Sequence, residues 1–184
     1  SILKSNMNDN LVHNISRTEP DLNSPNISHY TCDILNDNLP IIDKVDTLIY
    51  CPGSINLKPI NLLKEDDFRK DFEINVMGAI RAIKFYLNKL KESSTPNILM
   101  FSTVATKLGM PFHSSVAVSK AGVEGLTKSL AAELAPKIKV NAIAPTIANT
   151  PLASKILRNE KAIETIKERH PLKEILDPDN IAKL

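Results

Sequence analysis

The side chains best suited to bind or react with a ligand are an amine, an amide and two adjacent hydroxyls. They belong to Lys120 (in SKAG), Asn75 (in INVMG), Ser102 and Thr103. All four can donate hydrogen bonds, so the chemistry open to them is the binding of a polar ligand atom. Each also has a purely structural interpretation. Lys120 could be a solvated helix lysine, Asn75 a buried amide bonded to backbone, and the two hydroxyls the end of a strand.

Histidine and cysteine do not suggest a metal centre or a disulfide framework. The four histidines, at positions 13, 29, 113 and 170, are far apart, and none has metal-ligand spacing. Cys32 and Cys51 form neither a framework nor a CxxC pair, and free thiols fit a reducing compartment. We therefore expect a cytoplasmic protein without a metal.

Apolar runs bounded by turn residues predict an alternating α/β chain. Strands are expected at 11–15, 27–32, 45–51, 97–102 and 138–143, and helices at 64–91, 114–135 and 153–169, with a last helix opening at Asp177. Strands that alternate with helices favour one parallel sheet with helices on both faces. No linker divides residues 1–184, so we expect a single domain.

These elements place the chemical side chains at defined points. Ser102 and Thr103 follow the carboxyl end of a strand, Asn75 lies in helix 64–91, and Lys120 lies in helix 114–135. Ligands of doubly wound parallel sheets bind outside the carboxyl ends of the strands. We therefore expect the site at that edge of the sheet.

The overall composition limits the partners. The 184 residues carry 23 basic and 21 acidic side chains, a formal charge of +2, with no basic stripe. No apolar run approaches the about eighteen residues that a membrane span needs, and residues 1–10 lack the features of a signal peptide. We therefore expect neither a nucleic acid nor a membrane as a partner.

Three stretches together resemble the short-chain dehydrogenase/reductase family: DTLIYCPG over 46–53, DFEINVMG over 71–78, and 97–150 from NILMFSTVA to APTIANT. Each piece is weak alone, but their order and gaps match, and the resemblance runs from Leu11 through HPLKEILDPDNIA. It implies a Rossmann-type doubly wound parallel sheet that binds NAD(H) or NADP(H). It also implies hydride transfer to a carbonyl or from an alcohol.

The resemblance assigns roles to the chemical side chains. Lys120 matches the family lysine, which holds the nicotinamide ribose hydroxyls and lowers the pKa of a catalytic tyrosine. Asn75 matches the asparagine that bends a helix and anchors a proton-relay water. The serine that binds the substrate oxygen matches Thr103, which lies 13 residues before position 116, and Ser102 stands beside it as an alternative.

The position of the family tyrosine is occupied by Val116, four residues before Lys120. Valine cannot donate or accept a proton, and general acid–base groups contribute on the order of 10²–10⁴-fold in rate. Neighbouring residues do not restore a phenol, and the tyrosines lie in other elements, at positions 30, 50 and 86. We expect an altered mechanism in which water or a substrate group supplies the proton.

The resemblance also predicts cofactor contacts. Arg17 follows the first predicted strand, where the family often has an acid for the ribose of NAD; arginine instead suits the 2′-phosphate of NADP. The negative charges of Glu19 and Asp21 nearby act against the binding of a 2′-phosphate by Arg17, but NADP is favoured over NAD. The remaining matches are Asp33 near the adenine, Pro52 and Gly53 in place of the family's Ala-Gly, and Pro145, Ile147 and Thr150 near the nicotinamide.

The family's glycine-rich phosphate loop is not found among the five glycines. The first strand and its TGxxxGxG turn should precede Leu11 by a helix, and the final strand should follow 179–184. Either the chain is part of a longer protein, which the intact spacing favours, or it is a decayed paralogue. We expect a chain that is incomplete at both ends.

Three hypotheses remain open. The first is an NAD(P)-dependent oxidoreductase with an altered acid–base residue, and the second is a catalytically silent nucleotide-binding or scaffolding relative. The third is a subunit whose main task is assembly, because family members pair helices matching 64–91 and 114–135 into homodimers or homotetramers. The substrate is expected to be a small carbonyl or alcohol, with 151–169 as its specificity loop, either a lid or a solvated helix.

Overall fold

The computed structural model of the protein describes residues 2–6, 10–22 and 24–183. The chain divides into two compact units, one made of Ser1–Cys32 with Pro145–Leu184 and the other of Asp33–Ala144. The expectation of a single domain over 1–184 stays a prediction. The central unit, 33–144, contains all four predicted catalytic residues, Asn75, Ser102, Thr103 and Lys120.

The central unit is built on a three-stranded parallel sheet in the order β3–β4–β5. Its strands are β3 (Thr47–Tyr50), β4 (Asn97–Phe101) and β5 (Lys139–Ile143), each slightly shorter than predicted. Tyr50 is in register with Met100, and Met100 with Ala142. Because the strands are parallel and in register, the segments that follow β3 and β4 leave the sheet side by side at its carboxyl edge.

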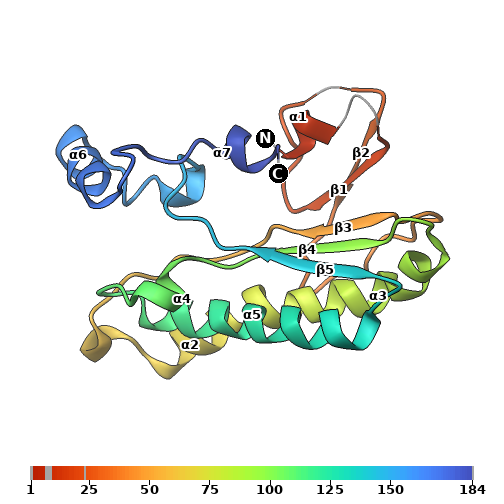
Figure 1. The fold of residues 1–184 in the computed structure, drawn as a ribbon, viewed down its shortest axis with the longest axis horizontal. Helices are drawn as coiled ribbons and strands as arrows, with labels where there is room; N and C mark the ends of the chain where they lie inside the picture. Colours follow the sequence, from red (N-terminus) through yellow and green to blue (C-terminus); the bar gives the residue numbers. More distant parts are fainter. Residues whose placement is uncertain (1, 7–9, 23, 184) are drawn as a thin grey trace. The chain divides into compact units, whose positions relative to one another are not determined.

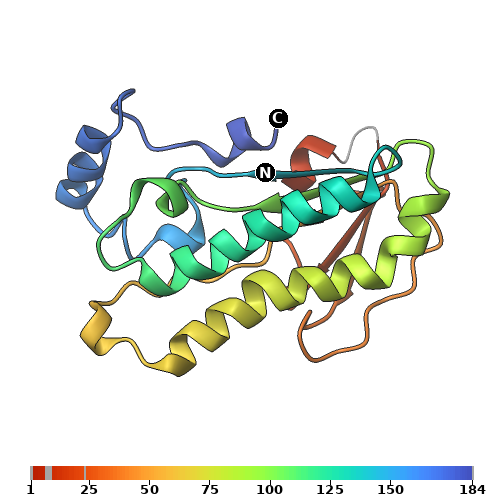
Figure 2. The ribbon, with the colours of Figure 1, turned by 60° about the horizontal axis from the view of Figure 1, so that its bottom comes forward.

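Two long helical stretches lie together on one face of this sheet (Figures 1 and 2). The helix predicted at 114–135 is α5 (Ser114–Leu134), preceded by the short α4 (Ala105–Leu108). The helix predicted at 64–91 is confirmed but not continuous. After the turn η1 (Ile60–Leu62) it runs as α2 (Glu65–Phe72), the π-helical segment η2 (Glu73–Met77) and α3 (Gly78–Glu92).

A hydrogen bond from the sheet explains where η2 lies. The Tyr50 hydroxyl donates to the carbonyl of Ile74 at 2.5 Å. A Cβ on Gly78 would collide with that hydroxyl, so only glycine allows the helix to approach. Burial raises the pKa of Tyr50 well above its usual value, so the phenol stays neutral and holds this contact. π-Helical segments occur frequently at functional sites, and this one contains Asn75.

The core lies between the sheet and these helices. Ile98 and Met100 of β4 are fully buried against Ala79 and Leu90 of α3 and Val123 of α5. Burying a large aliphatic side chain stabilises a fold by about 1.5–3 kcal/mol. Rigid packing on the helix side therefore fixes the carboxyl edge of the sheet.

The second unit contains a parallel pair, β1 (Val12–Ser16) and β2 (Ile27–Thr31), with the short α1 (Ile2–Asn6). Its later part holds η3 (Pro151–Ala153), α6 (Glu160–Arg169) and α7 (Pro178–Ile181). The predicted helix at 153–169 is wrong over 154–159. There the Asn159 side chain accepts a hydrogen bond from the Ala162 amide at 2.9 Å and so starts α6 as its N-cap.

A search of the described residues for a bilayer-spanning helix gives none, because none of their helices is both long and apolar enough.

Candidate active site

Three predicted residues from three different elements meet at the carboxyl edge of the sheet. Gly53 follows β3, Asn75 lies in η2 and Lys120 lies in α5. A Cβ placed on Gly53 would lie 3.2 Å from Asn75 Oδ1 and 3.3 Å from Lys120 Nζ. The absence of a side chain at position 53 therefore keeps this space open between the amide and the amine.

Lys120 is a buried lysine rather than a solvated one, with 9% of its surface exposed. Its Nζ donates to the carbonyl of Phe101, the last residue of β4, at 2.8 Å. Burial lowers the pKa of Lys120 to about 8, while the nearby Asp71 carboxylate acts in the opposite direction. The amine can therefore gain or lose a proton near neutral pH.

Asn75 is fully buried and bonded to side chains rather than to backbone. Its Nδ2 donates to Ser119 Oγ at 3.0 Å and to Ser54 Oγ at 3.3 Å. Its Oδ1 has no hydrogen-bond partner among the described residues. Buried polar atoms are nearly always paired, so this acceptor, at the edge of the space beside Gly53, suits a donor from a ligand or a water.

A buried carboxylate that the sequence analysis missed extends this network. Ser54 donates to Asp71 Oδ1 at 2.6 Å, and Ser115 donates to Asp71 Oδ2. Asp71 is 3% exposed and lies four residues before Asn75, one helical turn away. Its position at the start of DFEINVMG could have indicated an inward-facing acid.

The two candidate hydroxyls after β4 have different environments. Ser102 is buried and its Oγ donates to Glu124 Oε1 at 2.8 Å, so this hydroxyl is used inside the protein. Thr103 Oγ1 accepts a hydrogen bond from the Ala105 amide at 3.3 Å, and its O–H has no acceptor within the described part of the chain. Thr103 is therefore the hydroxyl that can still donate to a ligand.

Glu124, a second residue missed from the sequence, holds the Thr103 segment in place. Its carboxylate also accepts from Thr106 Oγ1 at 2.5 Å and pairs with Lys107 Nζ at 3.1 Å. Hydrogen bonds from Thr106 and Ser102 lower the pKa of Glu124 to about 2. Glu124 lies one turn after Lys120 on α5, so both residues bind the chain that flanks Thr103.

No tyrosine hydroxyl in the described residues replaces the phenol expected at position 116. Val116 is 5% exposed, and its carbonyl accepts from Ser119 Oγ at 3.0 Å. The three tyrosine hydroxyls have other partners: Tyr50 binds the Ile74 carbonyl, Tyr86 the Pro40 carbonyl at 2.7 Å, and Tyr30 contacts His13 Nδ1 at 3.3 Å. The site therefore has a lysine and a threonine but no phenolic acid.

The predicted cofactor residues are split between the two units. Pro52, Gly53, Lys120 and Asp33 belong to the central unit, where Asp33 Oδ1 accepts from the Leu35 amide at 2.9 Å. The second unit holds the other four, which are Arg17, exposed after β1, Pro145, Ile147, whose carbonyl accepts from the Leu176 amide at 3.2 Å, and Thr150, at the start of η3. Their joint role in binding one cofactor stays a prediction.

The site and fold agree with a family match. A family model described as Enoyl-(Acyl carrier protein) reductase matches residues 9–184. The chain belongs to the short-chain dehydrogenase/reductase family, as its motifs predicted. The predicted Rossmann-type α/β class is confirmed with it.

Among curated relatives, the chain is 32% identical over 142 residues to 3-oxoacyl-[acyl-carrier-protein] reductase FabG of Thermotoga maritima. That match covers 77% of this chain and 57% of the relative, so the chain spans little more than half of its length. The chain is also 25% identical over 179 residues to L-xylulose reductase of Bos taurus, covering 91% of this chain and 73% of that protein.

Solved structures give the same fold. The ligand-free aldohexose dehydrogenase of Thermoplasma acidophilum matches with a TM-score of 0.83 and 25% identity over 94% of this chain and 74% of its own. ElxO with NADP bound matches with a TM-score of 0.75 and 27% identity over 86% of this chain and 68% of its own.

Proposed function

We propose that the protein is an oxidoreductase that transfers a hydride between NADP(H) or NAD(H) and a small carbonyl or alcohol substrate. Family membership supports the class of reaction. The observation that carries the proposal for this chain is that Lys120 Nζ and the unpartnered Asn75 Oδ1 border the same space beside Gly53.

These residues fit a nicotinamide nucleotide. Ribose hydroxyls both donate and accept hydrogen bonds, and the site offers an amine donor, an unpaired amide acceptor and a backbone without a Cβ. When bound, the nicotinamide would supply or accept the hydride. Lys120 would bind the ribose, and Gly53 would allow the close approach.

The protein's own residues would handle the substrate oxygen and its proton. Thr103, whose O–H is free to donate, would bind the oxygen at which negative charge develops. Lys120, with a pKa of about 8, is positioned to give a proton in reduction or take one in oxidation, directly or through a water. Asn75 and Asp71 would act as positioning residues for that end of the site.

NADP is favoured over NAD. Arg17 lies directly after β1 and its guanidinium suits a 2′-phosphate, although Glu19 and Asp21 lie nearby in the sequence. One structural relative, ElxO, was solved with NADP bound. A tighter dissociation constant for NADPH than for NADH, lost in Arg17→Gln, would support this preference.

A second candidate is a catalytically silent nucleotide-binding or scaffolding relative, and Val116 favours it. Titration of NADPH and NADH fluorescence, followed by turnover assays across small carbonyls, tests both candidates. Turnover that is lost in Lys120→Ala supports the oxidoreductase. Dinucleotide binding without turnover supports the silent relative, and the absence of binding contradicts both.

We also propose that the protein assembles into a homodimer or homotetramer. Exposed apolar side chains occur along α2, η2, α3 and α5, at Phe72, Met77, Phe85 and Val118. Such side chains on neighbouring helices suit a second copy of the chain. Sedimentation equilibrium measures the oligomeric state directly, and a monomer would contradict the proposal. A cytoplasmic location stays a prediction.

A further inference from the structure

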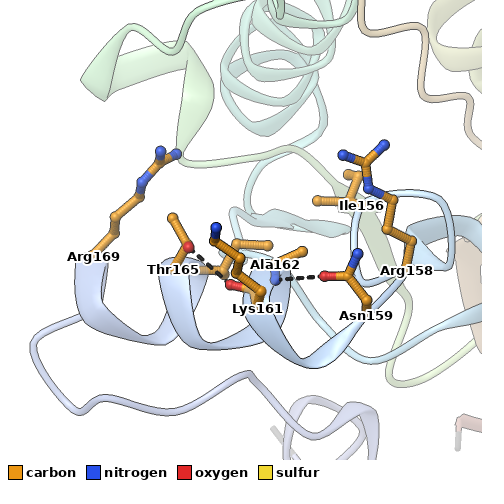
Figure 3. A pocket seen from close by; sticks show the side chains of 8 residues that line it. Ile156, Arg158, Asn159, Lys161, Ala162, Thr165 and Arg169 are labelled. Atoms are coloured by element: carbon orange, nitrogen blue, oxygen red, sulfur yellow. Dashed lines mark hydrogen bonds between the residues drawn. The ribbon is translucent and has the colours of Figure 1, made fainter.

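A hollow of about 460 Å³ lies against α6, within the segment expected to set substrate specificity. Figure 3 shows the side chains of its lining residues, which all come from one short stretch of the chain. They are Ile156, Arg158, Asn159, Lys161, Ala162, Thr165, Ile166 and Arg169. Typical small-molecule pockets have volumes of about 300–1,000 Å³, so the hollow is large enough for a ligand of a few carbon atoms with a polar head.

The lining contains three cations and no carboxylate. The long side chains of Arg158 and Arg169 extend from the two ends of the hollow toward the same side of α6 (Figure 3), as does that of Lys161. Within 2–6, 10–22 and 24–183, none of the three forms an ion pair. Their positive charge is therefore not cancelled by a protein partner.

The sequence of α6 separates its charges. The acids Glu160, Glu164 and Glu168 recur every four residues and so share one side of the helix, away from the pocket lining. Glu164 pairs with Lys167 at 3.0 Å rather than with a lining residue. The basic side chains on the pocket face are consequently available to a ligand.

The remaining lining groups are either already hydrogen-bonded or apolar. Asn159 caps the helix through the Ala162 amide, and Thr165 Oγ1 donates to the Lys161 carbonyl at 2.8 Å. Ile156, Ala162 and Ile166 add hydrocarbon surface. The pocket therefore offers cationic donors beside an apolar wall.

We propose that this pocket binds a small organic anion, a carboxylate or phosphate attached to a hydrocarbon portion. Guanidinium groups bind both anions through paired N–H donors, and the three exposed cations give this side of α6 a positive potential. The anion has two possible sources, the reaction's own carbonyl or alcohol substrate and a phosphate of the dinucleotide. The identification of either source rests on the proposed function, whereas the pocket itself does not.

Isothermal titration calorimetry with hexanoate, hexyl phosphate and hexanol tests the pocket. Both anions should bind and the neutral alcohol should not, with binding weakened by added salt. The double variant Arg158→Gln with Arg169→Gln should weaken anion binding about tenfold or more, because charge-assisted hydrogen bonds are lost. Lys137→Gln, which removes an exposed charge outside the lining and outside 151–169, should leave binding unchanged.

Equal binding of hexanoate and hexanol, or an equal loss in Lys137→Gln, would overturn the proposal. Circular dichroism establishes that each variant is folded. To separate the two sources of the anion, the unaltered protein and the double variant are compared. The Michaelis constants for a keto acid and for its neutral ester are measured, together with the dissociation constant for NADPH. If the double variant has a raised KM for the keto acid but not for the ester or a raised Kd for NADPH, the pocket binds the substrate. If it has only a raised Kd for NADPH, the pocket binds the cofactor phosphate. If no carbonyl is turned over, the proposed function fails while the hexanoate titration still decides the pocket.

Discussion

Lys120 and Asn75 lie on different helices, yet their polar ends border the same space beside Gly53. The sheet carries Gly53 to this point, the π-helical segment carries Asn75, and α5 carries Lys120. The Asn75 amide oxygen has no hydrogen-bond partner among the described residues, and the Lys120 side chain is buried. Both properties favour interaction with a bound polar group.

Adding a methyl group at position 53 should weaken both the folding of the protein and its binding of NADPH. In Gly53→Ala the new methyl group would lie 3.2–3.3 Å from Asn75 Oδ1 and Lys120 Nζ, so those side chains must shift. We expect a destabilisation of about 1–3 kcal/mol and weaker NADPH binding, measured by urea unfolding and fluorescence titration. Gly125→Ala is the control, since no atom lies within 4 Å of its Cβ. That exposed helix position should be stabilised by about 0.4–1 kcal/mol, with unchanged binding.

The titration of Lys120 should appear in the pH dependence of stability. Its pKa is about 8 in the folded protein, below the ordinary value of 10.5. Between these pH values the unfolded chain holds a proton that the folded chain has released, so Lys120 contributes a rise in the free energy of unfolding with pH. Burial raises the pKa of the neighbouring Cys51 thiol from 9.0 to about 11, so Cys51 contributes a fall above pH 9. The shift of Lys120 corresponds to about 3 kcal/mol. Denaturant unfolding from pH 7 to 9, below the range in which Cys51 acts, measures the rise.

Lys120→Met should remove this rise, and Lys128→Met, at an exposed position of the same helix, should keep it. An equal rise in both variants would show that another group is responsible.

The titration of Glu124 should appear in the pH dependence of stability at acidic pH, with the same sign as that of Lys120. Its pKa is lowered from 4.5 to about 2, so its contribution to stability is fully present above pH 4.5 and is lost as the pH falls toward 2. Glu124→Ala, which leaves Ser102, Thr106 and Lys107 without their acceptor, should cost about 1–3 kcal/mol at pH 7 and flatten this dependence. Denaturant titrations at pH 7, 4 and 2.5 provide the measurement. Glu133→Ala, an exposed acid on α5, should change neither quantity, and a similar loss there would contradict the role of Glu124.

Restoring the phenol tests the alignment of position 116. If Val116 occupies the place of an acid–base tyrosine, Val116→Tyr should raise carbonyl reduction by up to about 10²–10⁴-fold. Val116 is buried, so the larger ring should also cost about 1–3 kcal/mol, measured by thermal unfolding. Glu133→Tyr, at an exposed position of the same helix, is the matched control. No gain in a folded variant that binds NADPH would count against the alignment.

Much of the fold could be predicted from the sequence because its elements have strong local signals. Apolar runs predicted β3, β4 and β5 to within a few residues, and a sustained apolar stripe predicted α5. The interruption of the helix at Glu73–Met77 had no such signal, since it depends on the Tyr50–Ile74 hydrogen bond from a distant strand. The start of α6 depends on the Asn159 cap. The amphipathic pattern of the sequence continues through residue 159 and therefore predicted an uninterrupted helix.

The site was predictable only in part for a similar reason. Lys120, Asn75 and Gly53 stand in recognisable motifs, and the structure brings them together. Asp71 and Glu124 were missed, because acids on a helix usually face solvent and only the tertiary packing turns these two inward. The choice between Ser102 and Thr103 likewise depends on Glu124, which binds the first hydroxyl and leaves the second free to donate.

The most direct test of the central claim is an equilibrium titration of NADPH fluorescence. The claim is that the space beside Lys120 and Asn75 seats a nicotinamide nucleotide. Saturable binding is expected, weakened about tenfold or more in Lys120→Ala and unchanged in Lys128→Ala. The absence of binding of NADPH and NADH, or equal binding in Lys120→Ala and the unaltered protein, would contradict the claim.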